Sequence, residues 1–154
     1  MARLFVETVH HAAFRYGGWG VARQIGAAVT GHAGGERNTT AQRIDLMGLI
    51  AAMEGLPPGP VAIHSASPGL VKAARLLAAP PAPGSDQAPS EDLDLWAQAL
   101  KAVHGRTLTV GAAAAGPTAF LRAWAEVGQD KAKAAGRFSA AIPKSNLAKL
   151  ALPA

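Results

Sequence analysis

Apolar and polar positions alternate along the first quarter of the chain, and this pattern predicts three strands. Residues 3–9 alternate and carry large apolar side chains, which is typical of a half-buried strand. After a short loop, residues 17–25 and the glycine-containing segment 27–37 follow with similar patterns. Because the connections between them are short, we expect an antiparallel meander.

A helical period replaces the alternation after residue 38. Thr39 is predicted to cap this helix, and Gln42 three residues later would complete a capping box. The helix is expected to end at Gly55, which two prolines soon follow. The apolar residues expected on its buried face are Leu46, Leu49, Ile50 and Met53.

The rest of the chain alternates between helices and short strands. Residues 61–64 predict a buried strand, Ser67-Pro68 opens a helix, and residues 80–89 form a proline-rich linker. Ser90 is predicted to cap a further helix, which is followed by a strand at 107–110 and a long helix from Pro117. The order βββαβααβα predicts an α/β fold with a mixed five-stranded sheet and helices on its faces. The residues expected to face inward on the helix after Ser90 are Leu93, Trp96, Leu100 and Val103.

Composition limits the class of protein. The 154 residues suit one globular domain, with 49% hydrophobic and 16% charged residues. The absence of cysteine excludes disulfides and thiolate metal sites. The sequence has no apolar run of the roughly 20 residues that span a bilayer and no N-terminal leader, so we expect a cytoplasmic protein without a membrane partner.

The positive charge is concentrated at the C-terminal end. Residues 1–130 contain ten Lys or Arg and ten Asp or Glu, so the net charge of +5 comes from residues 131–154. We therefore divide the chain into a domain at 1–136 and a basic C-terminal extension at 137–154. The extension either attracts phosphates or is a solvated end of the chain. A third possibility is that Phe138, Ile142 and Leu147 dock on the sheet or on a protein partner.

Two carboxylates stand in a recognisable context. Glu7 lies ten residues before the GGWG segment at 17–20, and Asp45 lies in the segment NTTAQRIDL at 38–46. These segments resemble type I ribonuclease H over about residues 2–125. In that family an acid on the first strand and an acid on the first helix belong to the catalytic site. The resemblance implies that Glu7 stands where an Asp is usual and Asp45 where a Glu is usual.

The other two acids of that family are missing here. After the fourth strand the family has Thr-Asp-Ser, whereas this chain has Ser65-Ala66-Ser67, so Ala66 replaces the third acid. The first turn of the last helix, residues 118–122, contains no acid. Two-metal phosphodiester cleavage needs several converging carboxylates. The resemblance therefore implies a divergent member whose remnant site holds at most a weak Mg²⁺ or Mn²⁺ ion at Glu7 and Asp45.

The start of the first helix matches the stretch with which the family contacts nucleic acid. A helix N-terminus with threonine hydroxyls also suits a phosphate, although ordinary capping alone is the stronger explanation for Thr39 and Gln42. Taken singly, Glu7 could be a polar residue at a strand edge, and Asp45 could pair with Arg43 or His64. The residues that the resemblance implies for nucleic-acid binding are Asn38, Thr39, Thr40, Gln42 and Arg43.

These observations favour a nucleic-acid-binding protein with a degenerate two-metal site that is weakly active or inactive on RNA–DNA hybrids. One alternative is an active, divergent ribonuclease H that hydrolyses RNA in such hybrids. A second alternative is a non-catalytic protein-interaction module on the same scaffold, since a fold does not define a function.

Overall fold

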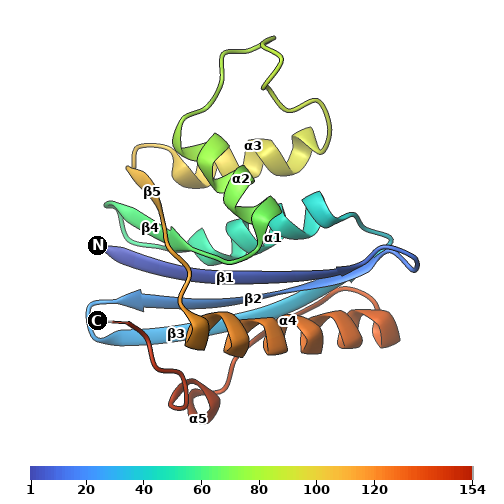
Figure 1. Cartoon of the computed structure of the whole chain (residues 1–154), viewed down its shortest axis with the longest axis vertical. Helices are drawn as coiled ribbons and strands as arrows, with labels where there is room; N and C mark the ends of the chain where they lie inside the picture. Colours follow the sequence, from blue (N-terminus) through green and yellow to red (C-terminus); the bar gives the residue numbers. More distant parts are fainter. Residues whose placement is uncertain (154) are drawn as a thin grey trace.

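The computed structural model describes residues 1–153 and has the predicted order of elements, followed by one more strand and a short helix (Figure 1). The elements are β1 (Ala2–His11), β2 (Tyr16–Ile25), β3 (Ala28–Arg37), α1 (Ala41–Met53), β4 (Val61–His64), α2 (Pro68–Ala78), α3 (Leu93–Val103), β5 (Leu108–Gly111), α4 (Ala115–Ala135), β6 (Phe138–Ala141) and α5 (Lys144–Leu147).

The strands form one mixed sheet in the order β5-β4-β1-β2-β3-β6. The meander of β1, β2 and β3 is antiparallel, whereas β4 pairs with β1 and β5 pairs with β4 in parallel. In the β1–β4 register, Phe5 lies opposite His64. The residues that follow β4 therefore emerge beside Glu7, and this places the turn into α2 next to the first strand.

The sheet has six strands, so the prediction of five strands is wrong by one. Gly136 ends α4 with a positive φ of 90°, and residues 138–141 then pair antiparallel with β3. The sequence FSAA has few of the β-branched and aromatic residues that mark strands, which explains why the pattern did not predict it. Ile142 and Leu147 beyond it are buried. The division of the chain at residue 136 stays a prediction, but residues after it contact the sheet.

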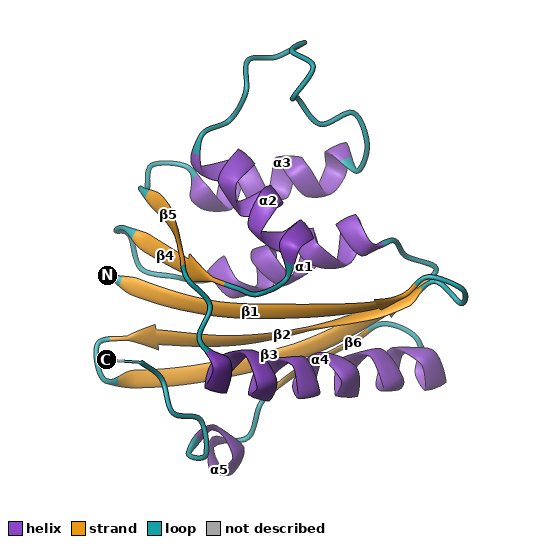
Figure 2. Ribbon diagram, in the orientation of Figure 1, coloured by secondary structure: helices purple, strands orange, loops and turns teal. Residues whose placement is uncertain are grey.

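Helices cover both faces of the sheet (Figure 2). The helices α1, α2 and α3 lie on one face and enclose the larger apolar core, to which β1 contributes Leu4 and Val6. The helix α4 lies on the other face, where a smaller core contains Phe5, Leu121 and the two buried residues of the C-terminal segment. Within residues 1–153, no helix combines the length and apolarity that crossing a bilayer would need.

The predicted face of α3 is partly wrong. The helix begins at Leu93 after an N-cap at Asp92, not after Ser90. Leu93 and Leu100 are exposed rather than buried. The helix, which packs against α1, keeps Trp96 and Val103 on its buried face and buries Leu95 and Ala99 in place of Leu93 and Leu100.

Glycines allow α4 to lie unusually close to the meander. A Cβ atom on Gly18 would overlap the carbonyl oxygen of Ala125 in α4. A Cβ atom on Gly128 of α4 would likewise overlap the carbonyl oxygen of Gly34 in β3. The backbones of sheet and helix are thus in direct contact, and this contact determines where the first turns of α4 reach.

We expect Gly18→Ala to destabilise the protein by about 1–3 kcal/mol, because an extra methyl group in a close-packed contact forces the backbone of α4 away. Chemical denaturation measures this change. Gly116→Ala is a matched control on the first turn of the same helix, where a Cβ atom meets no atom nearer than 3.6 Å. It should be neutral or stabilising by up to about 1 kcal/mol. Equal effects of the two substitutions would contradict the close contact.

Candidate functional site

Glu7 is buried in the middle of β1, just beyond the residues that pair with β4, and is held by the start of α2. Its side chain is 2% exposed and lies on the same face of β1 as Phe5, which faces α4. The backbone N–H of Ala66 donates to Oε2 at 2.8 Å, and the hydroxyl of Ser67 donates to Oε1 at 2.9 Å. Ser67 is the N-cap of α2, but its hydroxyl is directed to Glu7 and does not cap its own helix.

Arg122 supplies the positive charge nearest to Glu7. Its Nη2 atom lies 3.6 Å from Oε1 of Glu7, and its side chain is 48% exposed. Arg122 lies in the second turn of α4, in the segment where the resemblance implied a missing acid. The structure thus places the cation of Arg122 beside Glu7, in the segment of α4 where the family resemblance led us to look for a fourth carboxylate. Sequence reasoning missed this role, although a basic residue in that segment was a visible signal.

Asp45 lies in the second turn of α1 and contacts the opposite face of β1 through Thr8. It is 9% exposed, and the hydroxyl of Thr8 donates to its Oδ1 at 2.6 Å. A Cβ atom on Gly69 in the first turn of α2 would lie 2.5 Å from its Oδ2. Asp45 therefore also abuts the start of α2. It pairs with neither Arg43 nor His64, the two partners considered from the sequence.

One chain of hydrogen bonds joins the two carboxylates. The Oγ atom of Ser67 accepts from the backbone N–H of Thr8 at 3.2 Å while donating to Glu7. Thr8 in turn donates through its hydroxyl to Asp45. The structure therefore brings Glu7, Ala66 and Asp45 together at the N-terminus of α2, Ala66 through its backbone. Thr8 and Ser67, which sequence reasoning did not assign, connect them.

Burial raises the pKa of both carboxyl groups. For Glu7 desolvation is the largest cause, and the hydrogen bonds from Ala66 and Ser67 together with the charge of Arg122 oppose it. For Asp45 burial again raises the pKa, while the hydrogen bond from Thr8 and the nearby His10 oppose it. The loss of solvation therefore outweighs the nearby donors, and both side chains hold a proton more tightly than they would in water.

The donor set does not fit a pair of divalent ions. Both oxygens of Glu7 already accept protein hydrogen bonds, and Arg122 lies against one of them. Among residues 1–153, no three His, Asp or Glu side chains come together in a way that could hold a metal ion. A two-metal centre requires more hard oxygen ligands than Glu7 and Asp45 offer.

A cavity opens in front of Asp45. Its volume is about 330 Å³, and it lies between β1, the start of α1, the start of α2 and Arg122. His10 lines it and its Nε2 atom is hydrogen-bonded to the carbonyl oxygen of Thr39 at 3.1 Å. We call this cavity the carboxylate pocket. Asp45, Ser67 and Arg122 are among the polar residues that line it.

The start of α1 differs from the predicted cap. The N-cap is Thr40, whose hydroxyl accepts from the backbone N–H of Arg43 at 3.2 Å, so the prediction of Thr39 is wrong by one residue. Asn38 is exposed in the left-handed region with φ of 53°. Thr39 is therefore the last residue before the N-cap, and its side chain is buried. The backbone N–H of Thr39 donates to the carbonyl oxygen of Arg15 at 2.9 Å.

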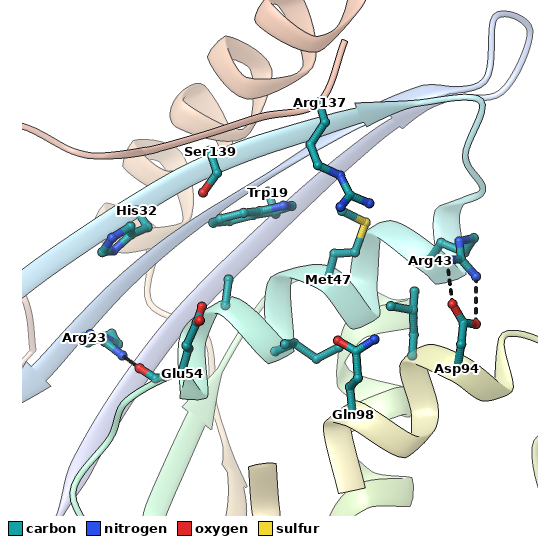
Figure 3. Close-up of a pocket in the computed structure, with 13 residues that line it drawn as sticks. Trp19, Arg23, His32, Arg43, Met47, Glu54, Asp94, Gln98, Arg137 and Ser139 are labelled. Atoms are coloured by element: carbon teal, nitrogen blue, oxygen red, sulfur yellow. Dashed lines mark hydrogen bonds and ion pairs between the residues drawn. The ribbon is translucent and has the colours of Figure 1, made fainter. Parts of the chain in front are cut away.

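Gln42 and Arg43 contact α3, and Gln42 does not complete a capping box. The amide of Gln42 donates to Asp92 at 3.0 Å. Arg43 makes paired contacts of 3.1 and 3.0 Å with Asp94 (Figure 3). It also donates to Asp92 at 3.0 Å. Its hydrogen bonds to the two carboxylates, with that to Asp94 the larger cause and that to Asp92 the next, raise the pKa of the Arg43 guanidinium group above its ordinary value. Its charge is therefore largely compensated within the protein.

Arg43 lies on the wall of a second cavity, on the side of α1 that faces β2 and β3 (Figure 3). This cavity has a volume of about 500 Å³, and Trp19 and Arg137 also line it. Arg137, one of the five C-terminal cations, forms an ion pair with Glu36 of β3. Part of the positive charge at the C-terminal end is thus paired with an acid of the sheet.

Known structures resemble this architecture. The N-terminal RNase H domain of a Mycobacterium tuberculosis protein, solved as a fusion with maltose-binding protein, aligns with a TM-score of 0.65 at 14% identity, over 87% of this chain and 98% of that chain. LC11-RNase H1, solved in complex with an RNA/DNA hybrid, aligns with 0.65 at 16% identity, over 86% and 99%. LC9-RNase H1, described as a type 1 RNase H with the type 2 active-site motif, aligns with 0.56 at 18% identity, over 96% and 83%.

These alignments establish the ribonuclease H-like fold of the chain, which the resemblance of its segments implied and the predicted order of its elements supported. Comparisons with protein-family models and with curated protein sequences found no match.

The raised pKa of Asp45 leads to a prediction for stability against pH. Because the folded protein binds this proton more tightly than the unfolded chain, the free energy of unfolding should fall as pH rises from about 4 through the raised folded pKa. Asp45→Asn keeps the acceptor for Thr8 and removes the charge. We expect the variant to lose less stability over this window and to equal or exceed the wild type at pH 7.

Urea denaturation at a series of pH values measures this difference. Asp86→Asn, at an exposed position in the loop between α2 and α3, is the matched control and should follow the wild-type profile. A wild-type profile that rises with pH relative to Asp45→Asn would show that the folded protein favours the Asp45 carboxylate, contrary to this account.

Proposed function

We propose that the protein binds nucleic acid on its ribonuclease H-like scaffold and cleaves RNA–DNA hybrids very weakly or not at all. The observation that carries the second part is the state of Glu7. Its two oxygens are held by Ala66, Ser67 and Arg122, so the donors of α2 and a guanidinium group provide the positive charge near it. Under this proposal these contacts, and not a bound metal ion, stabilise the buried Glu7 side chain.

The surface around the carboxylate pocket supports the nucleic-acid part. Arg122 lines the pocket and its side chain is half exposed, and a guanidinium group is a good donor to a phosphate oxygen. Thr40 and Asn38 are exposed at the N-terminus of α1, where backbone N–H groups favour anions. The chain as a whole carries a charge of +5. Gln42 and Arg43 contribute less to nucleic-acid binding under this proposal, because their side chains already bond to Asp92 at the start of α3.

The test uses the purified full chain and a fluorescently labelled RNA–DNA hybrid. We expect binding by fluorescence anisotropy with an affinity that falls with salt, and no cleavage above background in Mg²⁺ or Mn²⁺. Arg122→Ala should weaken binding and flatten the salt dependence by about 0.9 units, the value for one phosphate contact. Arg75→Ala is the matched control, because Arg75 is an exposed cation in the last turn of α2.

Two outcomes would contradict this proposal. Efficient cleavage by the wild-type chain would identify an active, divergent ribonuclease H. Failure to bind hybrid, duplex or single strands would exclude a nucleic-acid function and favour the protein-interaction module.

We also expect that Ala66→Asp alone does not restore hybrid cleavage. The new side chain would stand beside Glu7, but the second turn of α4 would still present Arg122 rather than an acid. Gel analysis of a labelled hybrid with Mg²⁺ or Mn²⁺ measures cleavage, and Ala62→Asp on β4 controls for an added acid. Cleavage by Ala66→Asp would show that three carboxylates suffice on this scaffold.

A further inference from the structure

The tip of the β1–β2 hairpin carries three aromatic rings that stack on one another. The ring centroids of His11 and Phe14 are 5.1 Å apart, those of His11 and Tyr16 are 5.1 Å apart, and those of Phe14 and Tyr16 are 6.1 Å apart. The rings of Phe14 and Tyr16 are nearly parallel, with 6° between their planes. Phe14 is 70% exposed, so one large apolar ring of this cluster lies mostly in water. The function proposed above does not use this cluster.

The hairpin tip is held in position by the backbone. The N–H of Arg15 donates to the carbonyl of His11 at 2.8 Å, and the carbonyl of Arg15 accepts from the N–H of Thr39 at 2.9 Å. Arg15 adopts a φ of 57°, a conformation that costs free energy for a residue with a side chain. Because these bonds tie the tip to the start of α1, the three rings are presented in a defined arrangement and need little further ordering on binding.

Positive charge surrounds the rings. The ammonium group of Lys133 in α4 lies 5.4 Å from the centroid of the Tyr16 ring. Arg15 is exposed within the tip, and Arg37 lies opposite Tyr16 in the β2–β3 register. The nearest acid along β3, Glu36, is already paired with Arg137. Aromatic faces next to cations are what proteins use to bind single strands, where bases stack and phosphates meet Lys and Arg.

The cluster is continuous with the carboxylate pocket. Thr39 bonds to Arg15 of the tip through its N–H and to His10 of the pocket through its carbonyl oxygen. The hairpin projects from the end of the sheet at which α1 begins (Figure 1). A strand whose phosphates lie along the start of α1 would therefore bring a neighbouring base to Phe14.

We propose that His11, Phe14 and Tyr16 form a stacking platform for unpaired bases of a nucleic-acid strand. This rests on the nucleic-acid function proposed above and specifies the form of the ligand. The occupant is a single-stranded segment, because the bases inside a duplex have both faces covered by their neighbours. Lys133 and Arg15 supply the contacts to its phosphates.

The experiment compares two labelled strands of equal length, oligo-dT and an abasic strand with the same phosphates. Fluorescence anisotropy with the full chain measures both affinities across a range of salt concentrations. Phe14→Leu keeps an apolar side chain but removes the ring. We expect it to bind oligo-dT about 5- to 100-fold more weakly than wild type, to bind the abasic strand equally well, and to keep the same salt slope.

Further variants separate stacking from charge. Phe14→Trp should retain or strengthen oligo-dT binding, because it restores a flat ring. Lys133→Ala should weaken both strands and reduce the salt slope by about 0.7 units, as expected for one contact to a single strand. Leu93→Ala, which removes an exposed apolar side chain on α3, is the matched control and should change neither affinity. Circular dichroism and thermal unfolding check that each variant is folded.

The outcomes distinguish this platform from the broader function. Unchanged oligo-dT binding by Phe14→Leu, or equal losses on both strands, would overturn the platform while leaving nucleic-acid binding intact. Binding to hybrid but not to single strands would also overturn it, and would leave the rings available to a protein partner. Absence of binding to any nucleic acid would overturn both proposals.

Discussion

The burial of Glu7 is the constraint on which the centre of this protein depends. A carboxylate in a low-dielectric site is costly unless donors or positive charge compensate it. Parallel pairing of β1 with β4 brings the start of α2 to Glu7, where Ala66 and Ser67 donate hydrogen bonds from the positive end of the helix. Arg122 adds a full charge from the opposite layer. Two segments that are distant from Glu7 in sequence, the start of α2 and the second turn of α4, thus stabilise this one side chain.

The glycines beneath α4 make the contribution of Arg122 geometrically possible. Because Gly18 and Gly128 allow backbone to touch backbone, α4 lies close enough to the sheet for the side chain of Arg122 in its second turn to reach Glu7 in β1. A larger residue at either position would lift the helix and lengthen the contact between Arg122 and Glu7. Packing in the smaller core and electrostatics at the centre are therefore linked, although no residue belongs to both.

Much of the fold could be predicted from the sequence, because large apolar residues mark β1, β4 and the helices through their periods. The sixth strand could not, since Phe138–Ala141 forms a strand by pairing with an open sheet edge and not by its own preference. The cap of α1 moved from Thr39 to Thr40 because a left-handed Asn38 and a bond to Arg15 set the entry to the helix. Both differences come from contacts between distant segments.

The candidate site could be predicted only in part, for a related reason. The positions of Glu7 and Asp45 follow from their places on β1 and α1, which local patterns define well. The partners of Asp45 and Arg43 do not follow, because Thr8 and Asp94 are selected by the packing of strand and helices in three dimensions.

The contacts around Glu7 also explain how the centre tolerates a buried carboxylate. An alanine at position 66 places no second negative charge beside Glu7, and its backbone N–H donates a hydrogen bond to that side chain. In the second turn of α4, Arg122 supplies a positive charge instead of requiring one. Both features lower the electrostatic cost of burying Glu7. The buried centre is therefore satisfied by contacts within the fold, whereas the neighbouring hairpin tip exposes 70% of Phe14, and this difference is why the proposed stacking of bases is assigned to the tip and not to the carboxylates.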